Sequence, residues 1–591
     1  MCRIITLIIL ILSGPTQAQV RFTIRMPRAE QHQFQVTMTL TAPAHLLDVT
    51  MPTWTPGYYQ FLHFAKNVSG FAATASTSGQ AVPWTQINEH TWRIATQPGQ
   101  LLAINYTVTT LRPFVAQPYV DTARAYIVPT GVCLYPEGRL EEAVEITVDK
   151  PAAWPHIATG LAPVSGQQYT YRAENYDVLY DSPLLVGRLT QLPSFEVRGV
   201  PHHFWAWNPG TFDQNAFIAE LQKVVTAAVD LIGHIPYEQY VFIGIGPGRG
   251  GIEHLNSTTF SFNGQNLHQG EERLRMLFFL GHEYYHHYNV KRIRPLELGP
   301  FDYTRGSRTR SLWISEGLTV YYEYLIARRA GICSDEDLLM ALQKNILAYE
   351  DKPGKQHQSL AEASYYTWSD GPFGRTEDEV NKTISYYDKG PVVGWLLDLA
   401  IRQATGNARS LDDVMRTLYT EYYQKQNRGF TEEEFKSLCT AVSGSNLGEI
   451  WDYVNTTRDL DYSKYLHYAG LTIDTQWQDV PGAWLGVTGA WRADSLRISQ
   501  VEYSSPAWQA GLRRGQVILS VAGQKPVKEQ PLLQLMAQKP GDRLSLSLWD
   551  GIQHRELTIV LGLKKARSFK ITPQGIKDEQ QEKVYQGWTK G

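Results

Sequence analysis

The sequence predicts a multidomain protein of the α+β class, with an antiparallel β domain first, a mainly helical region next, and a smaller strand-rich module near the end. The chain has 591 residues, which is too many for a single ordinary core and enough for about three or four domains. Apolar residues alternate with polar ones at the start, recur at helical spacing in the middle, and alternate again near residue 471. The boundaries that these changes suggest are 19–193, 194–470 and 471–563.

The first residues have the pattern of a secretory signal peptide. One Arg precedes a mostly apolar run from Ile4 to Leu12, and small or polar residues follow as far as Ala18. A membrane anchor is the alternative, but about nine apolar residues cannot cross ~30 Å of hydrocarbon. We therefore expect cleavage after residues 1–18, a secreted or periplasmic mature chain, and no stable insertion into a membrane.

Composition excludes some classes of partner. The formal net charge is −3 and charged residues make up 19% of the chain, so no basic surface for nucleic acid is expected. Cys2 leaves with the signal peptide, and Cys133, Cys333 and Cys439 are too few for more than one internal disulfide. None of them lies in a CxxC pair, which argues against a cysteine-ligated zinc. Peptides or small molecules remain the expected ligands.

The N-terminal domain is predicted from short alternating runs separated by Pro, Gly and Asn. These runs are QFQVTMTLT, HTWRIAT, LLAINYTVTTL, AVEITVDK and QYTYRA. A helical pattern then begins at Phe212 and breaks at Gly233, and YVFIGIG follows as a strand. Helices are predicted from Glu271 to about Tyr453, with one polar loop at 351–381 that is long enough to cover a site.

The segment GHEYYHHYNVKRIRP, residues 281–295, is predicted to lie on a helix that runs from Glu271 to Arg294 and stops at Pro295. His282 and His286 are then i and i+4, on one face, at a separation where two imidazoles can bind one zinc ion. Glu283 is placed to reach a metal-bound water. His287 points about 100° away and is expected to pack or hydrogen-bond. These residues alone leave a metal site and an ordinary His-rich helix equally open.

A third ligand is available on the next helix. LWISEGLTVYYEYLIARRAG predicts a helix that begins near Ser315 and ends at Gly331, with Glu316 in its first turn. A glutamate there also stabilises any helix N-terminus, which is the alternative role. Its neighbours Trp313, Ile314 and Leu318 favour burial, and a buried carboxylate requires a partner such as a metal. Zinc hydrolases need such a third ligand and an open fourth position.

HEYYH followed by WISEG resembles the gluzincin metallopeptidases. The wider sequence, in four stretches, is similar to the glycyl aminopeptidase family with a C-terminal PDZ domain, over nearly the whole mature chain. These stretches are MPTWTPGYYQFLHFAKNVSGF at 51–71, RGGIEH at 249–254, HHYNVKRIRPLELGPFDY at 286–303 and SYYDKG at 385–390. The resemblance implies a thermolysin-like, mainly helical catalytic domain at 194–470. It also implies one zinc ion on His282, His286 and Glu316, with Glu283 as general base.

The same resemblance implies two further site residues. Related aminopeptidases carry a Gly-x-x-Glu-Asn strand whose Glu binds the substrate's free α-amine, and this chain has GGIEH. Glu253 is thus the candidate amine anchor, and His254 departs from the family pattern but is a second candidate substrate contact. A plain turn followed by a solvated strand residue is the alternative. By similarity SYYDKG supplies a Tyr that stabilises the tetrahedral intermediate, which is Tyr387, with Tyr386 or a packing role as alternatives.

Residues 471–563 resemble a PDZ domain. SPAWQAGLRRGQVILSVAG is the most characteristic part, WLGV at 484–487 is the expected carboxylate-binding loop, and a short helix is expected around Gln530 to Ala537. Such domains bind a C-terminal peptide at a sheet edge, so one is an expected partner. A domain that only packs on the catalytic unit is the alternative. Residues 564–591 are basic and polar and are expected to form a loose tail.

The resemblance therefore implies a secreted zinc aminopeptidase that acts on peptides with a free N-terminus and a small first residue of the Gly or Ala type. Water activated by zinc would attack the first peptide bond. Two alternatives remain open. One is an endopeptidase for protein quality control, to which the PDZ domain delivers substrates, and the other is a non-catalytic peptide-binding protein with a structural zinc.

Overall fold

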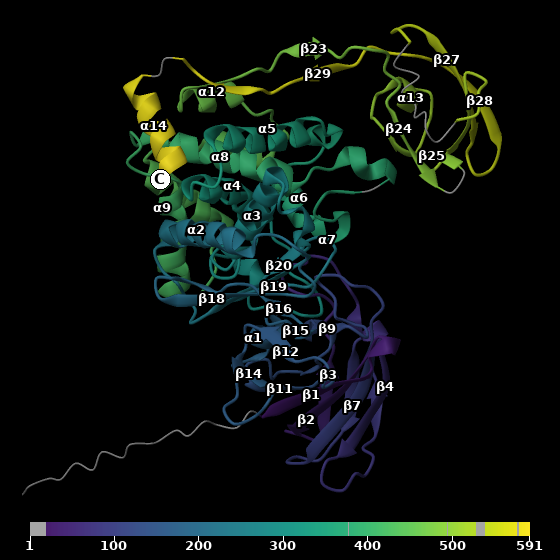
Figure 1. Cartoon of the computed structure of the whole chain (residues 1–591), viewed down its shortest axis with the longest axis vertical. Helices are drawn as coiled ribbons and strands as arrows, with labels where there is room; N and C mark the ends of the chain where they lie inside the picture. Colours follow the sequence, from purple (N-terminus) through teal and green to yellow (C-terminus); the bar gives the residue numbers. More distant parts are fainter. Residues whose placement is uncertain (1–18, 376, 493–494, 527–537, 576–577) are drawn as a thin grey trace, which may run out of the picture. The chain divides into compact units, whose positions relative to one another are not determined.

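The computed structural model describes residues 19–375, 377–492, 495–526, 538–575 and 578–591 (Figure 1). The expected signal peptide and the short helix expected around Gln530 to Ala537 lie outside the described residues. The chain forms two compact units, of which the first comprises residues up to 222 with 235–276 and 300–307, and the second comprises 223–234, 277–299 and 308–591. Among the described residues, the structure contains no helix with the length and apolar character to cross a membrane.

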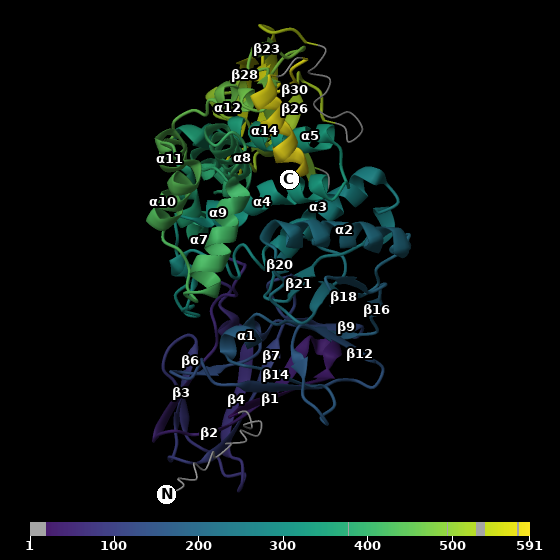
Figure 2. The ribbon, with the colours of Figure 1, turned by 90° about the vertical axis from the view of Figure 1, so that its left-hand side faces the viewer.

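The first unit begins with the predicted β domain (Figure 2). Its largest sheet has the order β13 (Ala162–Pro163), β14 (Thr170–Ala173), β11 (Val144–Asp149), β1 (Val20–Arg28), β2 (Gln33–Thr41), β7 (Leu101–Thr109) and β4 (Val68–Ala75). A second sheet has the order β10 (Tyr135–Pro136), β3 (Leu46–Thr50), β6 (Thr91–Ala95) and β5 (Trp84–Gln86). A third has the order β12 (His156–Thr159), β15 (Leu184–Gly187), β9 (Arg124–Ile127) and β8 (Tyr119–Val120). The strands are mostly antiparallel, as predicted, but β1 and β11 run parallel.

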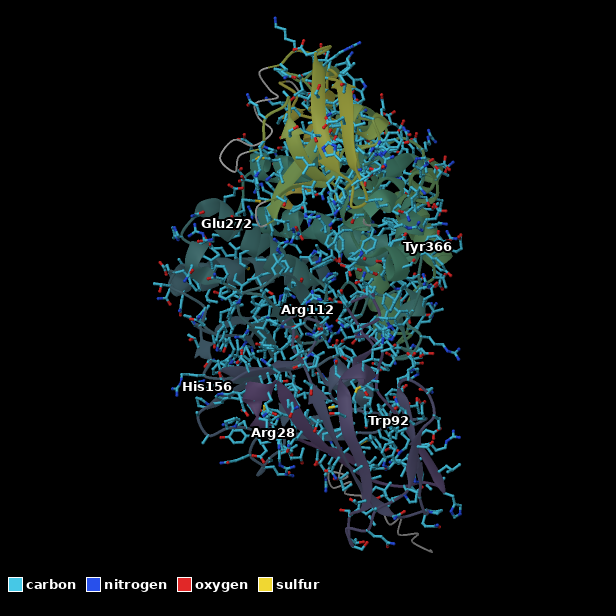
Figure 3. The ribbon with its side chains drawn as sticks, turned by 90° about the vertical axis from the view of Figure 1, so that its right-hand side faces the viewer. Arg28, Trp92, Arg112, His156, Glu272 and Tyr366 are labelled. Carbon is cyan, nitrogen blue, oxygen red and sulfur yellow. The ribbon has the colours of Figure 1, made fainter. Side chains whose placement is uncertain are left out.

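The period-two pattern of the sequence places the core correctly. Along β2, Phe34, Val36 and Met38 are buried and the residues between them are not, because successive side chains point to opposite faces of a sheet. Trp92 of β6, labelled in Figure 3, stacks on Phe71 of β4 with ring centroids 5.2 Å apart. The β domain thus has a hydrophobic core of its own.

A mixed sheet follows in the first unit and presents Glu253 at its edge. The strands are β16 (Thr190–Gln191), β18 (Val200–Ala206), β19 (Tyr240–Gly244), β21 (Ser257–Phe260) and β20 (Gly251–Glu253) in spatial order, with β17 (Phe195–Val197) also paired to β18. β18, β19 and β21 run parallel, whereas β20 pairs antiparallel with β21. The helix predicted before Gly233 is confirmed as α2 (Gln214–Ile232).

The second unit contains the predicted helices. They are α3 (Gly270–Tyr285, which begins in the first unit), α4 (Leu318–Arg329), α5 (Asp335–Glu350), α6 (Leu360–Tyr365), α7 (Thr367–Asp370), α8 (Tyr386–Ala404), α9 (Leu411–Thr417), α10 (Glu432–Ser443), α11 (Gly448–Asn455) and α12 (Tyr462–His467). α8 packs against α4 and α5 (Figure 1). Most of the α8 side chains are buried, so this helix forms the centre of the helical region.

Two expectations about this region were wrong. The helix predicted to reach Arg294 ends at Tyr285, and the following residues form turns in which the His286 ring contacts the backbone oxygen of Asn289 at 2.6 Å. The segment 351–381, expected as one long loop, contains α6 and α7. Ser359 and Glu362 form a capping box at the start of α6, which stabilises a helix in a polar stretch.

The PDZ-like module is joined to the rest of the second unit through paired strands. β22 (Leu471–Ile473) pairs with β30 (Ile571–Pro573), and β23 (Trp477–Asp479) pairs with β29 (Lys565–Arg567). The module itself contains β24 (Val487–Arg492), β25 (Ser495–Val501), α13 (Pro506–Gln509), β26 (Val517–Val521), β27 (Arg543–Trp549) and β28 (His554–Val560). The chain therefore enters and leaves the module along neighbouring antiparallel strands.

The chain end is not a loose tail. Residues after β30 form α14 (Glu579–Lys590), which packs on α4 and α8 in both Figure 1 and Figure 2. Trp588 is 0% exposed, stacks on Trp395 of α8 at 5.3 Å, and donates its indole N–H to the Tyr321 hydroxyl at 3.0 Å. A few apolar residues on one face are enough to fix this helix, although the segment is polar overall.

Candidate metal centre

The two histidines of HEYYH converge at the end of α3. Nε2 of His282 lies 2.8 Å from Nε2 of His286, and both side chains are buried. This is the geometry predicted from the i, i+4 spacing, because the backbone N–H of His286, one residue past the end of α3, still donates to the backbone oxygen of His282 at 3.2 Å. Glu283 follows His282 in the same turn and is also buried.

Glu316 completes the group. It lies in a π-helical turn, Trp313–Gly317, that leads into α4, and its Oε2 is 3.3 Å from Nε2 of His286 and 3.8 Å from Nε2 of His282. The ligand atoms of the three residues all lie within 4.8 Å of one another. Two imidazole nitrogens and a carboxylate oxygen in a buried cluster are a donor set that suits zinc. The residues present therefore fit the ion that the sequence predicts.

Two glycines let the ligand-bearing turn approach α8. A Cβ added to Gly317 would lie 2.7 Å from Cα of Gly390, and one added to Gly390 would lie 2.8 Å from Cα of Gly317. Backbone therefore meets backbone at this crossing, since any side chain would collide with main-chain atoms. The glycines of WISEG and DKG are thus explained by packing. Their contact places the first turn of α8 beside Glu316.

Tyr387 lies in that first turn and reaches the ligand set. Its hydroxyl donates to Oε2 of Glu316 at 2.9 Å, and its backbone N–H donates to the N-cap hydroxyl of Ser385 at 3.1 Å. The hydroxyl of Tyr386 instead contacts Oγ1 of Thr367 at 3.2 Å, and its ring is buried. Of the two tyrosines considered from sequence, only Tyr387 has its hydroxyl at the candidate metal centre in the described structure.

Both histidines are oriented through their second ring nitrogen. Nδ1 of His282 lies 2.8 Å from Oε2 of Glu323, and Nδ1 of His286 lies 2.6 Å from the backbone oxygen of Asn289. The hydrogen bond of His286 fixes its ring, and the carboxylate of Glu323 beside Nδ1 of His282 leaves Nε2 of that ring for the metal. Sequence reasoning missed Glu323, although its position seven residues after Glu316, two turns along the helix, was a usable signal. The Asn289 backbone contact had no sequence signal, because it depends on where α3 ends.

The carboxylates of the site differ in electrostatic environment. Burial raises the pKa of Glu316, but His286, His282 and the Tyr387 hydroxyl together outweigh this and leave its pKa below the ordinary value. An ionised carboxylate is the form that binds a metal. Burial raises the pKa of Glu323 well above its ordinary value. The nearby His286 and a hydrogen bond with the Tyr324 side chain lower this pKa only in part.

In the first unit, Glu253 ends the edge strand β20. The residue is 4% exposed, and its Oε1 has no hydrogen-bond partner within the described part of the chain. Gly57 packs directly on this carboxylate, because a Cβ at Gly57 would lie 2.9 Å from Oε2. Burial of an ionised carboxylate is unfavourable unless a partner compensates the charge. The alternative role of Glu253, a solvated strand residue, is therefore wrong.

His254 is held by neighbouring side chains. Its Nδ1 lies 3.3 Å from Oδ1 of Asp181 and its Nε2 lies 3.3 Å from Oγ1 of Thr259, while the backbone N–H of Leu255 donates to Oδ2 of Asp181 at 2.6 Å. These contacts fix the end of β20. A direct substrate contact by His254 stays a prediction.

Other candidate residues have local partners. The buried ring of His287 contacts the backbone oxygen of Tyr284, as expected for a residue that does not share the metal. Arg308 and Arg310 stack on the Tyr365 ring, with 5.7 and 5.6 Å between each guanidinium carbon and the ring centroid. Both arginines are exposed, so this contact lies at the surface.

Comparison with known families gives three matches along the chain. Residues 21–188 match the peptidase M61 N-terminal domain, residues 275–393 match the M61 glycyl aminopeptidase domain, and residues 497–550 match a PDZ domain. Residues 21–188 and 275–393 thus resemble two domains of the M61 glycyl aminopeptidase family, as the sequence predicted. The protein is a zinc metallopeptidase, and the predicted PDZ domain is confirmed.

Solved structures resemble this protein in fold. An aminopeptidase N family protein from Idiomarina loihiensis is 24% identical, with a TM-score of 0.88 over 96% of this chain and 100% of that chain. An M1 zinc metallopeptidase from Deinococcus radiodurans is 15% identical, with a TM-score of 0.45 over 75% of this chain and 95% of that chain. No curated protein matches the sequence. At these identities the first similarity supports the fold alone.

Proposed function

We propose that this zinc aminopeptidase is a secreted enzyme that removes a small first residue, of the Gly or Ala type, from peptides with a free N-terminus. The observation that carries the proposal is the buried group of His282, His286 and Glu316, with the Tyr387 hydroxyl 2.9 Å from Glu316. Peptide hydrolysis by a metalloenzyme needs a hydrogen-bond donor that stabilises the oxyanion close to the metal. The Tyr387 hydroxyl lies beside a ligand of the candidate metal centre and can supply this donor. The N-terminal leader supports the secreted or periplasmic location.

Each side chain has a chemical task in this proposal. When bound, zinc would bring the pKa of a water toward ~7 and polarise the scissile carbonyl. Glu283 accepts the proton of that water and later delivers it to the leaving amine. Tyr387 donates its O–H to the oxygen that becomes negative as the carbonyl is attacked.

Glu253 is proposed to bind the substrate's α-ammonium group. An exopeptidase must recognise the chain terminus, and a carboxylate with an unpartnered buried oxygen gives a charge-assisted hydrogen bond to an ammonium group. His254, the residue directly after the strand, is proposed as a second substrate contact, with its ring held by Asp181 and Thr259. The first residue of the substrate is thereby placed by its amine and not by its side chain.

The PDZ domain is proposed to bind a C-terminal peptide at the WLGV loop. Gly486 in this loop has φ +80°, and a Cβ there would lie 2.2 Å from Cβ of Ser505. Only glycine therefore fits at this position without strain. Exposed backbone N–H groups in such a loop are the usual ligands for a terminal carboxylate.

Aminoacyl reporter substrates test the reaction. Glycyl and alanyl reporters should be cleaved, cleavage should stop on chelation and return with zinc, and internally quenched peptides with blocked N-termini should resist. Glu283→Gln should keep its zinc and lose hydrolysis, whereas Glu253→Gln should raise KM most for free-amine peptides. Cleavage of blocked peptides would instead support the endopeptidase, and an inactive wild type with bound zinc would support the peptide-binding protein.

A further inference from the structure

An exposed aromatic ring covers Tyr387. Phe373 is 71% exposed, yet its ring stacks on that of Tyr387, with centroids 5.5 Å apart and an interplanar angle of 28°. Large apolar side chains are scattered over most protein surfaces and need no explanation alone. Phe373 differs because its neighbour is the tyrosine whose hydroxyl contacts Glu316.

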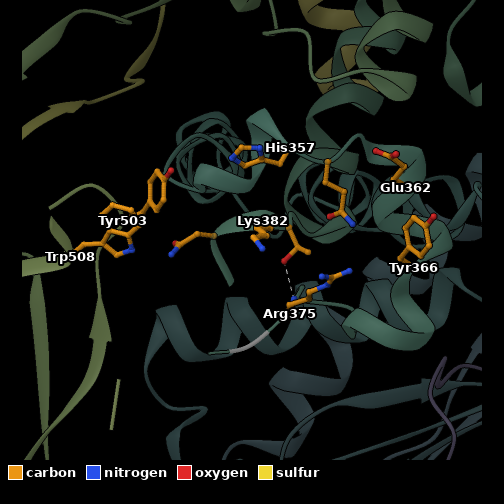
Figure 4. Close-up of a pocket in the computed structure, with 10 residues that line it drawn as sticks. His357, Glu362, Tyr366, Arg375, Lys382, Tyr503 and Trp508 are labelled. Atoms are coloured by element: carbon orange, nitrogen blue, oxygen red, sulfur yellow. Dashed lines mark hydrogen bonds between the residues drawn. The ribbon is translucent and has the colours of Figure 1, made fainter. Parts of the chain in front are cut away.

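The turn that carries Phe373 is fixed on both sides. Before it, the backbone oxygen of Pro372 accepts from the Ser385 hydroxyl at 2.8 Å. After it, the backbone N–H of Arg375 donates to Oγ1 of Thr383 at 2.9 Å, which is drawn in Figure 4. The Arg375 side chain also donates to Asp370 at 2.9 Å. Hydrogen bonds to α7 and to the residues before α8 therefore hold the turn that carries Phe373.

Gly374 lets this turn close. Its φ is +88°, and a Cβ there would lie 2.6 Å from Oγ1 of Thr383. A residue with a side chain would strain the backbone and push Thr383 away. The turn thus fixes the ring of Phe373 over Tyr387 with one face packed and much of its surface open to solvent. An apolar group that approaches Tyr387 would cover that surface.

We propose that Phe373 is a specificity-determining residue, which packs against an apolar side chain of the substrate next to the scissile bond. This inference rests on the proposed function, in which Tyr387 binds the scissile carbonyl oxygen. Because the first residue is small in that function, the side chain that meets Phe373 belongs to the second residue. Peptides with a Leu or Phe at position two are the preferred class.

Dipeptide hydrolysis tests this assignment. For wild type, Ala-Leu and Ala-Phe should have higher kcat/KM than Ala-Gly. Phe373→Ala should lower kcat/KM for Ala-Leu by about tenfold, the scale of one apolar contact in a specificity pocket, and change Ala-Gly by less than about twofold. Phe373→Leu should recover most of the preference. Ile552→Ala is a matched control, since Ile552 is an exposed apolar residue of the PDZ module, 87% exposed, and should change neither substrate.

Each other outcome overturns the proposal in a distinct way. Equal losses on Ala-Gly and Ala-Leu, with zinc content and melting temperature unchanged, would show that Phe373 only positions Tyr387. If Phe373→Ala lowers kcat/KM for Gly-Gly and Leu-Gly to different extents, Phe373 contacts the side chain of the first residue instead. No loss at all would exclude substrate contact. A wild type that cleaves no dipeptide would overturn the aminopeptidase function itself, and this proposal with it.

Discussion

The hydroxyl of Tyr387 lies 2.9 Å from Oε2 of Glu316, so the residue proposed to bind the oxyanion shares a carboxylate with the metal ligand set. The contact exists because Gly317 and Gly390 allow the two backbone segments to touch. The Tyr387 hydroxyl also contributes to the lowered pKa of Glu316. One helix crossing therefore positions both a ligand and a donor.

Removal of the Tyr387 hydroxyl should slow the chemical step. We expect Tyr387→Phe to reduce kcat by about 10²–10³, as for the loss of one oxyanion donor, with little change in KM or zinc content. Tyr386→Phe is the matched control, because its hydroxyl contacts Thr367 and not the centre. It should cost about 1 kcal/mol of stability and leave kcat close to wild type. Steady-state kinetics of both variants decide between the two tyrosines.

A side chain at the glycine crossing should disturb the same contact. In Gly390→Ala the new Cβ would lie 2.8 Å from Cα of Gly317, so α8 and the Glu316 turn must move apart. We expect a loss of about 1–3 kcal/mol in the free energy of unfolding, together with a lower kcat. Gly270→Ala, where a Cβ meets no atom within 4 Å, should do neither. Unchanged activity in Gly390→Ala would contradict the packing argument.

Glu323 should tune the affinity for zinc. Its carboxylate lies 2.8 Å from Nδ1 of His282, so Glu323→Gln weakens the partner that orients this ring. We expect zinc to bind about 10–100-fold more weakly, measured by competition with a chelator of known affinity. Glu271→Gln on the exposed first turn of α3 serves as the control. Equal affinities for the two variants would show that Glu323 does not support the ligand.

Lys389 should make stability depend on pH. Lys389 is 0% exposed, and its Nζ lies 5.2 Å from the centroid of the Tyr349 ring. Burial lowers the pKa of Lys389 from 10.5 to about 8. Between these values the unfolded chain binds more protons than the folded one, so this lysine adds stability as pH rises. Relative to Lys389→Met, the free energy of unfolding of wild type should increase by about 3 kcal/mol as pH rises from about 8 to 10.5. Near neutral pH, wild type should be the less stable of the two proteins. Denaturant unfolding of both proteins over that pH range measures the difference, and a difference that does not vary with pH would contradict the lowered pKa.

Local spacing predicted the part of the site that lies on single elements. His282 and His286 meet because a helix repeats every 3.6 residues, and Glu316 was found because a glutamate among large apolar residues needs a partner. The alternation of the first domain predicted its strands and buried faces for the same reason. Such patterns depend only on residues close in sequence.

Contacts between distant segments were not predictable in this way. Phe373 covers Tyr387 only because its turn is held by Thr383 and Ser385. The chain end resembled a tail because its few apolar residues are spread over one helical face. Trp588 becomes a core residue only when α14 meets Trp395.

Anomalous scattering at the zinc absorption edge, from crystals grown with zinc, tests the central claim most directly. We expect one peak, about 2.0–2.2 Å from Nε2 of His282, Nε2 of His286 and a carboxylate oxygen of Glu316. A peak bound by other residues, or no peak at these three, would contradict it.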